Sequence, residues 1–405
     1  MIDHDIIISG AGYIGLATAV SIKQAAPQFN IVVIDAAPDG IWKNDTRASA
    51  VAAAAVRMLG QLGIWDNIEA ESQPITEMIV TDSKTADPVR PVFLTFGGDA
   101  EPGEPFARMV SNVAMVRELR TRAAEMGLHI KQSTAAVGFT RENGSSKLTL
   151  KNGDVLTCRL AIACDGVKST LRDAAGIKAT HIDYGQSAIV GTVAHERPHE
   201  GRAEEHFLPA GPFATLPLSG NRSSIVWTES TKDAERILNE DPFIFEAELE
   251  QRFGLKLGAL KFEGKPKTYP LGLTLVRDFV RDGLALAGDA AHGIHPIAGQ
   301  GLNLGFKDAA ALAEVVVEAQ RRGEDFGSLA VLERYEQWRR FDTVRMGVTT
   351  DLLNRLFSND NSILRLARTV GLGLVDRLPK MKQFFIGEAA GLSPTSPRLL
   401  SGEAI

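Results

Sequence analysis

The glycine pattern at Gly10–Gly15 (GAGYIG) constrains the fold of this 405-residue chain more than any other feature. It follows an apolar run, Asp5–Ser9, that predicts a buried strand, and it opens an apolar-periodic stretch, Gly15–Ala25, that predicts a helix. Ile31–Asp35 predicts a second buried strand. Strand, turn, helix and strand in this order indicate a βαβ unit that begins a parallel sheet.

The spacing of the glycines is typical of dinucleotide binding. Gly10 permits a tight turn, Gly12 lets the backbone approach a diphosphate, and Gly15 allows close packing of helix on strand. The first amides of the helix then face the diphosphate. Asp35 lies about 20 residues beyond, where a carboxylate can accept a hydrogen bond from a ribose 2′-hydroxyl. The acidic Asp35 disfavours NADP at this position, but the motif does not distinguish NAD from FAD. The alternative interpretation is a glycine turn that binds no ligand.

Bulk composition narrows the class of protein. Hydrophobic residues make up 44% and charged residues 23%, which is typical of a globular protein long enough for two domains. The net charge of −6 argues against a protein that coats nucleic acid. The two cysteines, Cys158 and Cys164, fall in one predicted strand, which disfavours a disulfide and favours a reducing, cytoplasmic setting. No signal peptide or membrane span is predicted, so we expect a soluble protein, or one attached at most to a membrane surface.

The rest of the chain alternates between segments whose composition favours antiparallel strands and segments whose composition favours helices. Short runs rich in Thr, Val and Ile predict antiparallel strands from about Ile75 to Phe96 and from Ile182 to Tyr269. The other stretches favour helices or single strands, and the tail from about Arg345 favours helices that fray toward the end. These expected elements are helices at Ala48–Leu62 and Val113–Met126, strands at Ser146–Leu150 and Thr157–Cys164, and a strand, loop and long helix after Ala285.

The order of these predicted strands and helices indicates an α/β fold in which a Rossmann-like cofactor domain carries an inserted, mostly antiparallel substrate domain. We expect the cofactor domain to comprise residues 1–74, 98–180 and 270–345. The substrate domain would comprise residues 75–97 and 181–269, and residues 346–405 would form a helical C-terminal region.

A second motif follows the strand that ends at Cys164. Asp165-Gly166, with Ser169 and Arg172 at fixed spacing, predicts a turn that leads into a helix. An ordinary Asp-Gly turn capped by Ser169 explains the segment equally well.

A third motif is the most specific. Leu284–His292 predicts a buried strand that ends in Gly288-Asp289, and Gly299-Gln300-Gly301 then opens a helix. Asp289 can accept hydrogen bonds from a polyol, and the glycine loop presents amides and a positive helix end. A reduced flavin needs such groups, because negative charge builds at N1 and at the C2 carbonyl. The length of this pattern disfavours a loop that merely turns, so FAD is the predicted dinucleotide.

The three motifs, in this order, resemble those of the class A flavoprotein aromatic hydroxylases, the relatives of para-hydroxybenzoate hydroxylase. Asp45–Ala50 (DTRASA) and Gly288–Ala309 are similar to the ubiquinone-biosynthesis hydroxylases within that group. The resemblance implies hydroxylation of the aromatic ring of a polyprenyl phenol. It also implies FAD, transient reduction by NAD(P)H without a separate nicotinamide domain, and reaction of O₂ to a C4a-hydroperoxide.

The resemblance also implies a role for each residue along the cofactor. Arg47 would reach the pyrophosphate, Asn112 stands where relatives often have Gln, and Asp165-Gly166 would serve both FAD and NAD(P)H. Asp289 would hold the ribityl chain. The implied FAD-binding residues are Gly10, Gly12, Gly15, Asp35, Arg47, Asn112, Asp165, Gly166, Gly288, Asp289, Gly299, Gln300, Gly301, Leu302 and Asn303.

His292 and His295 are candidate acid–base groups for a substrate phenol, with Pro296 and Gln300 in the same segment as further catalytic candidates. Both histidines could instead only hold the shape of the loop. No metal site is predicted, because neither histidine has partners at ligand spacing. The aromatic residues Phe207, Phe213 and Trp227 either line a substrate pocket or belong to a core.

Apolar and basic residues alternate in the tail, as in Leu352–Phe357, Ile363–Arg368 and Leu378–Phe385. Such segments favour contact with an anionic membrane surface, although packing on the protein itself or on another subunit explains them too. Association with other ubiquinone-biosynthesis proteins is a further possibility. Hydroxylation of another small aromatic compound, reduction of prenyl double bonds and a non-catalytic FAD-binding subunit remain alternative functions.

Overall fold

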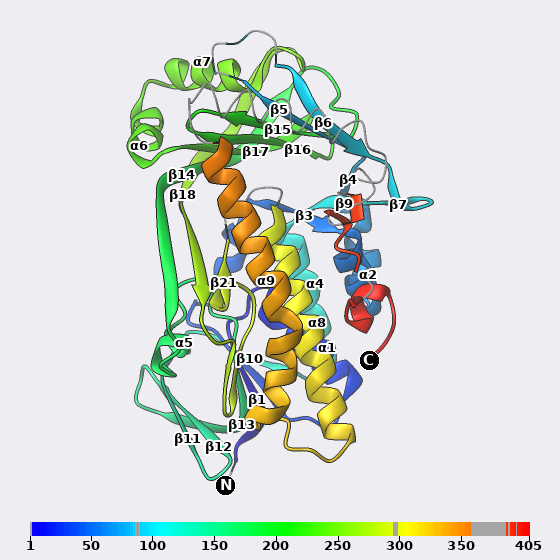
Figure 1. Cartoon of the computed structure of the whole chain (residues 1–405), viewed down its shortest axis with the longest axis vertical. Helices are drawn as coiled ribbons and strands as arrows, with labels where there is room; N and C mark the ends of the chain where they lie inside the picture. Colours follow the sequence, from blue (N-terminus) through cyan, green and yellow to red (C-terminus); the bar gives the residue numbers. More distant parts are fainter. Residues whose placement is uncertain are drawn as a thin grey trace.

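The computed structural model describes residues 2–405 except 84, 86, 88–89, 295–298, 358–385, 388 and 394. Two large sheets lie toward opposite ends of an elongated molecule (Figure 1). Helix α8 (Gln300–Arg321) packs against helix α9 (Leu329–Phe357), which runs lengthwise from the first sheet to the second.

The first sheet begins with the predicted βαβ unit. Its parallel strands follow the order β10-β2-β1-β13, and β20 pairs with the end of β13. Antiparallel β11, β12 and β19 extend it. The strands are β1 (His4–Ser9), β2 (Ile31–Ile34), β10 (His129–Lys131), β11 (Ala136–Glu142), β12 (Ser145–Leu150), β13 (Val155–Ala163), β19 (Val280–Arg281) and β20 (Leu284–Leu286).

The core of this half lies between the sheet and its helices. Ile6, Ile7 and Ile8 of β1 have no exposed surface, and burial of each such side chain stabilises the fold by roughly 1.5–3 kcal/mol. Helix α1 (Tyr13–Ala25) packs against both α8 and α4 (Asn112–Glu125). The sequence therefore predicted the position of the glycine turn between β1 and α1 correctly.

The helix expected at Ala48–Leu62 is only partly present. Ala48–Ala52 forms strand β3, and helix α2 starts at Ala53 and ends at Gln61. β3 pairs antiparallel with β9 (Ala107–Ser111), and β9 also pairs with β4 (Gln73–Ile75). Alanine has the highest intrinsic helix propensity, but such propensities are small, and pairing with the distant strand β9 overrides them here.

The second sheet has the order β21-β18-β14-β17-β16-β15-β5-β6. All its pairs are antiparallel except β15 with β5. β14 and β18 are 17 residues long and pair along most of their length. The strands are β5 (Glu77–Asp82), β6 (Val92–Gly97), β14 (Ala179–His195), β15 (Arg202–Leu208), β16 (Gly211–Leu218), β17 (Arg222–Ser230), β18 (Leu260–Val276) and β21 (His292–Gly293).

Two helices interrupt the stretch for which the sequence predicted only strands. α6 (Thr231–Asn239) and α7 (Pro242–Phe253) cover the outer face of the second sheet (Figure 1). Both carry recognisable start signals: Ser230 accepts a hydrogen bond from the amide of Asp233, and Asp241 accepts one from that of Phe243. These capping residues were the sequence signal for the two helices, although the surrounding Thr- and Val-rich residues favour strands.

The end of the chain does not fray as expected. A short 3-10 turn at Arg398–Ser401 packs against α2, and Leu399 and Leu400 are buried there. No helix among the described residues is long and apolar enough to cross a membrane. The remaining elements are the helices α3 (Trp65–Ile68) and α5 (Thr170–Ala174), the strands β7 (Asp99–Glu101) and β8 (Glu104–Pro105), and 3-10 turns at Ile41–Asn44, Glu69–Glu71 and Gly288–Ala290.

Candidate functional site

The three glycines of the first motif have different surroundings. A Cβ atom at Gly10, whose φ is +108°, would lie 2.3 Å from the carbonyl oxygen of Cys164. A Cβ atom at Gly15 would lie 2.0 Å from the carbonyl oxygen of Gly10. Nothing lies within 4 Å of the corresponding position at Gly12. Gly10 and Gly15 therefore serve the packing of β1, β13 and α1, whereas Gly12 leaves open space where a diphosphate can approach the amides of α1.

Asp35 follows β2 and faces the same turn. Its Oδ2 accepts a hydrogen bond from the amide of Ala11 at 2.9 Å, and its Oδ1 accepts one from that of Ala37 at 2.8 Å. Each carboxylate oxygen keeps a second lone pair for a ribose hydroxyl. A cavity of about 190 Å³ lies beside it, lined by Ala11, Gly12, Tyr13, Asp35, Ala37, Ile41, Trp42, Asp45, Arg47, Asn112, Val116, Arg120 and Gln132.

Arg47 and Asn112, both expected at the pyrophosphate, meet at Asp45. Arg47 donates to Asp45 through Nε at 2.8 Å and through Nη2 at 2.7 Å, and Asn112 Nδ2 donates to the same carboxylate at 3.1 Å. The Arg47 guanidinium also lies over the ring of Tyr269 at 5.0 Å. Burial raises the pKa of Asp45, but the hydrogen bonds from Arg47 and Asn112 outweigh it and lower that pKa. Asp45 was not a predicted site residue; its place two residues before Arg47 was the available signal.

The second motif has features of both interpretations that the sequence left open, an ordinary capped Asp-Gly turn and a part of the cofactor site. Ser169 caps α5 by accepting a hydrogen bond from the amide of Arg172 at 3.0 Å, as in an ordinary turn. Arg172, however, also donates to the carbonyl of Ala290 at 3.3 Å and so ties this turn to the third motif. Asp165 Oδ2 accepts a hydrogen bond from the amide of Leu171, whereas its buried Oδ1 has no partner within the described part of the chain. Gly166 has a φ of +84°.

The third motif lies next to the first. A Cβ atom at Gly288, whose φ is +62°, would lie 3.3 Å from the side chain of Ile14 in α1. The side chain of Asp289 is open to solvent. The protein atoms around its carboxyl group nevertheless raise the pKa of Asp289 by desolvation. Both ends of an FAD-sized ligand therefore find polar groups around the start of α1, which fits the cofactor.

The glycine loop at the start of α8 is held by Asn303. The Asn303 amide accepts from the backbone N–H of Ala52 at 2.9 Å and donates to the carbonyls of Ala50 at 2.9 Å and Gly299 at 3.2 Å. Its polar atoms thus bind protein backbone, although the resemblance places Asn303 among the flavin contacts. Leu302 is largely buried, whereas Gln300 and Gly301 are partly exposed at the helix start.

The proposed catalytic residues divide into two groups. His292 has no exposed surface, and its Nε2 lies 2.5 Å from Oδ2 of Asp308. This burial favours the structural alternative for His292 over direct contact with a substrate. His295 and Pro296 lie outside the described residues. Gln300 remains the accessible candidate of this segment.

The aromatic candidates also separate. Phe213 and Trp227 have no exposed surface and pack in the core between the second sheet and helices α6 and α7. They therefore belong to a core and do not line a substrate pocket. Phe207 is also buried, but its neighbour His206 pairs with Phe213 across the strands. Because side chains alternate along a strand, Phe207 points to the opposite face of the sheet, away from α6 and α7.

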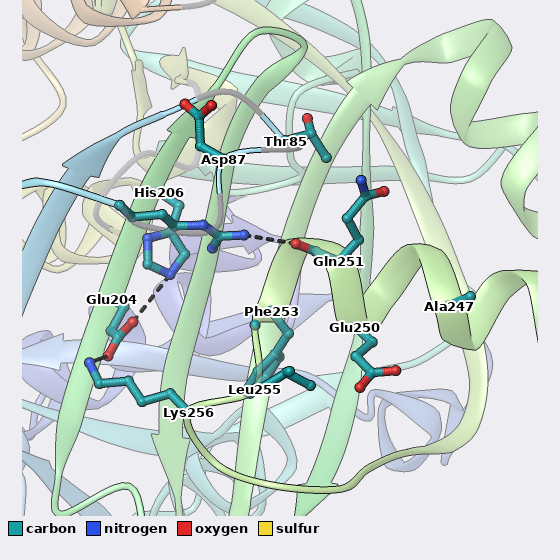
Figure 2. Close-up of a pocket in the computed structure, with 12 residues that line it drawn as sticks. Thr85, Asp87, Glu204, His206, Ala247, Glu250, Gln251, Phe253, Leu255 and Lys256 are labelled. Atoms are coloured by element: carbon teal, nitrogen blue, oxygen red, sulfur yellow. Dashed lines mark hydrogen bonds and ion pairs between the residues drawn. The ribbon is translucent and has the colours of Figure 1, made fainter.

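A larger cavity, of about 680 Å³, lies on the outer face of the second sheet beside α7 (Figure 2). Glu204 bonds there to His206 Nε2 at 3.2 Å and to Lys256 Nζ at 2.6 Å. Arg90 donates to the carbonyls of Gln251 and Arg252 at the end of α7. No predicted FAD-binding residue lines this cavity, so it is separate from the cofactor site.

Comparison with known proteins identifies the family of the chain. The family model described as "FAD binding domain" matches residues 3–345. The chain is 42% identical to "Ubiquinone hydroxylase UbiL" of Rhodospirillum rubrum over 98% of this chain and 92% of that one. It is 33% identical to the Escherichia coli "3-demethoxyubiquinol 3-hydroxylase" over 96% and 98% of the two chains.

Solved structures show the same fold. The p-nitrophenol 4-monooxygenase PnpA of Pseudomonas putida superposes with a TM-score of 0.76 at 17% identity, over 96% of this chain and 98% of that one. The OxyS anhydrotetracycline hydroxylase of Streptomyces rimosus superposes with a TM-score of 0.73 at 22% identity, over 96% and 76% of the two chains. The chain therefore belongs to the FAD-binding-domain family and is a flavin-dependent hydroxylase.

Proposed function

We propose that this protein hydroxylates the aromatic ring of a polyprenyl phenol, a precursor of ubiquinone. One observation carries the proposal: both halves of an FAD site meet around α1 in a chain 42% identical to a ubiquinone hydroxylase. The substrate class comes from the names of such relatives. The chemistry comes from the arrangement of this chain's own residues.

The protein's part is to bind, orient and shield. The amides at the start of α1 and the Arg47 guanidinium would hold the diphosphate, and Asp35 would hold the adenosine ribose. Asp289 would accept hydrogen bonds from the ribityl chain. Bound FAD supplies the activation of O₂ that a protein side chain cannot provide. The amides of Gln300 and Gly301, at the positive end of α8, would stabilise negative charge on a cofactor ring bound in front of the helix start.

The second sheet would cover the ring that is hydroxylated. Its inner face, which carries Phe207, is turned away from α6 and α7, and α9 packs against β16 and β18. Such a cover excludes water and fixes the ring carbon to be attacked to within about an ångström. NAD(P)H is the proposed electron donor, acting transiently because the sequence carries no second glycine motif of the GxGxxG type after a strand.

The decisive experiment is mass spectrometry of quinone intermediates in cells that lack this protein. We expect accumulation of a polyprenyl phenol that lacks one ring hydroxyl, and the accumulating species identifies the missing step. An unchanged quinone profile, or accumulation of a fully hydroxylated quinone whose prenyl chain has more double bonds than that of the wild-type product, would contradict the proposal. The second result would identify the rival prenyl reductase.

Two further measurements separate the remaining alternatives. Product formed by the purified, FAD-loaded protein should require O₂, whereas a prenyl reductase reoxidises its flavin with the prenyl substrate under anaerobic conditions. Asp289→Ala should abolish complementation in cells. A non-catalytic FAD-binding subunit would tolerate loss of flavin, so full complementation by this variant would favour that role.

A polyprenyl substrate resides in a membrane, so we also propose peripheral membrane contact. Exposed apolar side chains of α9 recur at helical spacing: Phe341 is 72%, Val344 47%, Val348 57% and Leu352 60% exposed. The tail segments Ile363–Arg368 and Leu378–Phe385, which suggested this contact, lie outside the described residues. Flotation with anionic vesicles tests it, and Phe341→Ser with Val348→Ser should reduce binding without loss of flavin.

A further inference from the structure

A buried cluster of charges lies directly behind the Gly288-Asp289 turn. Asp308 of α8 has no exposed surface, and neither has His292. Asp308 Oδ2 accepts hydrogen bonds from the backbone N–H of Gly288 at 3.0 Å and from Nε2 of His292 at 2.5 Å. Its Oδ1 accepts one from Nε of Arg339 at 2.8 Å. One carboxylate therefore joins α8, β21 and α9 to the turn that presents Asp289.

Helix α9 supplies the counter-charge. Arg339 is 1% exposed, and besides Asp308 it binds Asp342 at 3.0 Å. One turn earlier, the hydroxyl of Tyr335 donates to the carbonyl of Leu286 at 2.7 Å, at the end of β20. α9 thus binds the end of β20 directly through Tyr335, and it reaches the Gly288 turn through Asp308, to which Arg339 donates a charged hydrogen bond.

The cluster works only if Asp308 stays ionised. Burial raises the pKa of Asp308, but His292 and Arg339 outweigh burial and hold that pKa below its usual value. A buried carboxylate without partners would instead take up a proton. Ionised, Asp308 accepts three hydrogen bonds, and the bond from Gly288 holds a backbone whose φ of +62° is left-handed.

We propose that Asp308 is a positioning residue for FAD. Its carboxylate, balanced by Arg339, holds the Gly288 turn so that Asp289 points at the cofactor, and the charges of the pair act electrostatically on the flavin. Asp308 and His292 are within electrostatic reach of Asp289, since both affect the pKa of its carboxyl group. The inference rests on FAD binding alone and not on the identity of the aromatic substrate, so it is tested without substrate.

Two substitutions of opposite charge test it. Asp308→Asn keeps the size and one acceptor but removes the negative charge, and Arg339→Gln removes the positive charge. Each should weaken FAD binding about ten- to a hundredfold, the range for loss of a buried charged hydrogen bond. The apoprotein is titrated with FAD, and flavin fluorescence gives the dissociation constant.

The flavin midpoint potential supplies the readout that a merely structural role would not move. Reduction adds negative charge to the flavin, so Asp308→Asn should shift the potential to more positive values and Arg339→Gln to more negative values. The double variant restores the charge balance and should return the potential toward that of the wild-type protein. Should Asp308→Asn fail to fold, Arg339→Gln carries the test alone.

The second sheet offers a matched control. Glu229 is also buried, and it accepts hydrogen bonds from Nε of Arg252 at 2.8 Å and from Nε1 of Trp227 at 2.8 Å. Glu229→Gln should lower the melting temperature while leaving FAD affinity and potential unchanged. The proposal is overturned if Glu229→Gln weakens FAD binding as strongly, or if the two charge variants shift the potential in the same direction or not at all.

Discussion

Arg47 is bound on two sides at once, by the carboxylate of Asp45 from its own loop and by the ring of Tyr269 from β18. The guanidinium that the resemblance assigns to the pyrophosphate is thus held in place before any phosphate arrives. Asp45 competes with the phosphate for the same donors, since an Arg fork matches either anion.

This competition predicts opposite effects for the two partners. Arg47→Ala should weaken FAD binding about ten- to a hundredfold through loss of charged hydrogen bonds. Asp45→Asn should leave FAD affinity unchanged or raise it, because the guanidinium is released to the phosphate. Titration of the apoprotein with FAD measures both. Arg117→Ala, which breaks an exposed pair with Glu71, is the control and should change nothing. A large loss of affinity in Asp45→Asn would show that Asp45 orients Arg47 rather than competes for it.

Substitutions at two glycines of the first motif should have different effects, one on FAD affinity and the other on the stability of the apoprotein. Gly12→Ala adds a methyl group where nothing lies within 4 Å, so the apoprotein should melt at the wild-type temperature. FAD affinity should nevertheless fall at least tenfold, because the methyl group projects into the space for the diphosphate. Gly10→Ala places its methyl group 2.3 Å from a carbonyl oxygen and should destabilise the apoprotein by several kcal/mol. Equal melting temperatures for the two variants would contradict this division of roles.

Stability should fall as the pH drops below about 6.5, partly through His206. Burial lowers the pKa of His206 despite the bond to Glu204, so the folded protein keeps the imidazole neutral where the unfolded chain protonates it. The contribution of neutral His206 to the free energy of unfolding is therefore fully present at a pH above the pKa of histidine in the unfolded chain. It is lost as the pH falls toward the lower pKa of His206 in the folded protein. In His206→Gln, the melting temperature should depend less on pH between 7 and about 5. The exposed His129 serves as control, and His129→Gln should keep the wild-type slope.

The two cysteine thiols should resist labelling in the folded protein. Burial raises the pKa of Cys158 to about 12 and also raises the pKa of Cys164, whose thiol lies against Thr18 of α1. Because the thiolate is the reactive form, an aromatic disulfide reagent at pH ~8 should modify neither residue in native protein. Both should react in denaturant. Rapid labelling of the native protein would show that β13 opens away from α1.

Those parts of the site that depend on neighbours in sequence were predictable. The turn between β1 and α1, the carboxylate at Asp35 and the Gly288-Asp289 turn are each specified by a few consecutive residues. The role of Asp308 was not predictable, because its partner Arg339 follows 31 residues later on another helix. The strand at Ala48–Ala52 was missed for the same reason: its partners are β9 and the amide of Asn303, both far along the chain.

Local signals were present for α6 and α7 but were outweighed by the surrounding texture. Ser230 and Asp241 cap the two helices, and Pro242 stands at the first position of α7, where its missing N–H costs nothing. The buried end of the chain was less accessible to prediction. Leu399 and Leu400 follow a Pro- and Ser-rich stretch typical of a loose tail, and only the packing against α2 shows otherwise.

The two 17-residue strands β14 and β18 have a mechanical consequence. They are paired from Ala179 with Val276 at one end to His195 with Leu260 at the other, and the ladder is irregular at two places, between Asp183 and Gln186 and between Val190 and Thr192. A hydrogen-bonded ribbon resists sliding of one strand past the other, because every ladder bond would have to break, whereas it bends readily at a bulge. The β14–β18 ribbon that connects the second sheet to the cofactor half is therefore stiff except at these two irregularities. We expect movement of the second sheet relative to the cofactor half to take the form of a bend at these two irregularities rather than a slide along the ribbon.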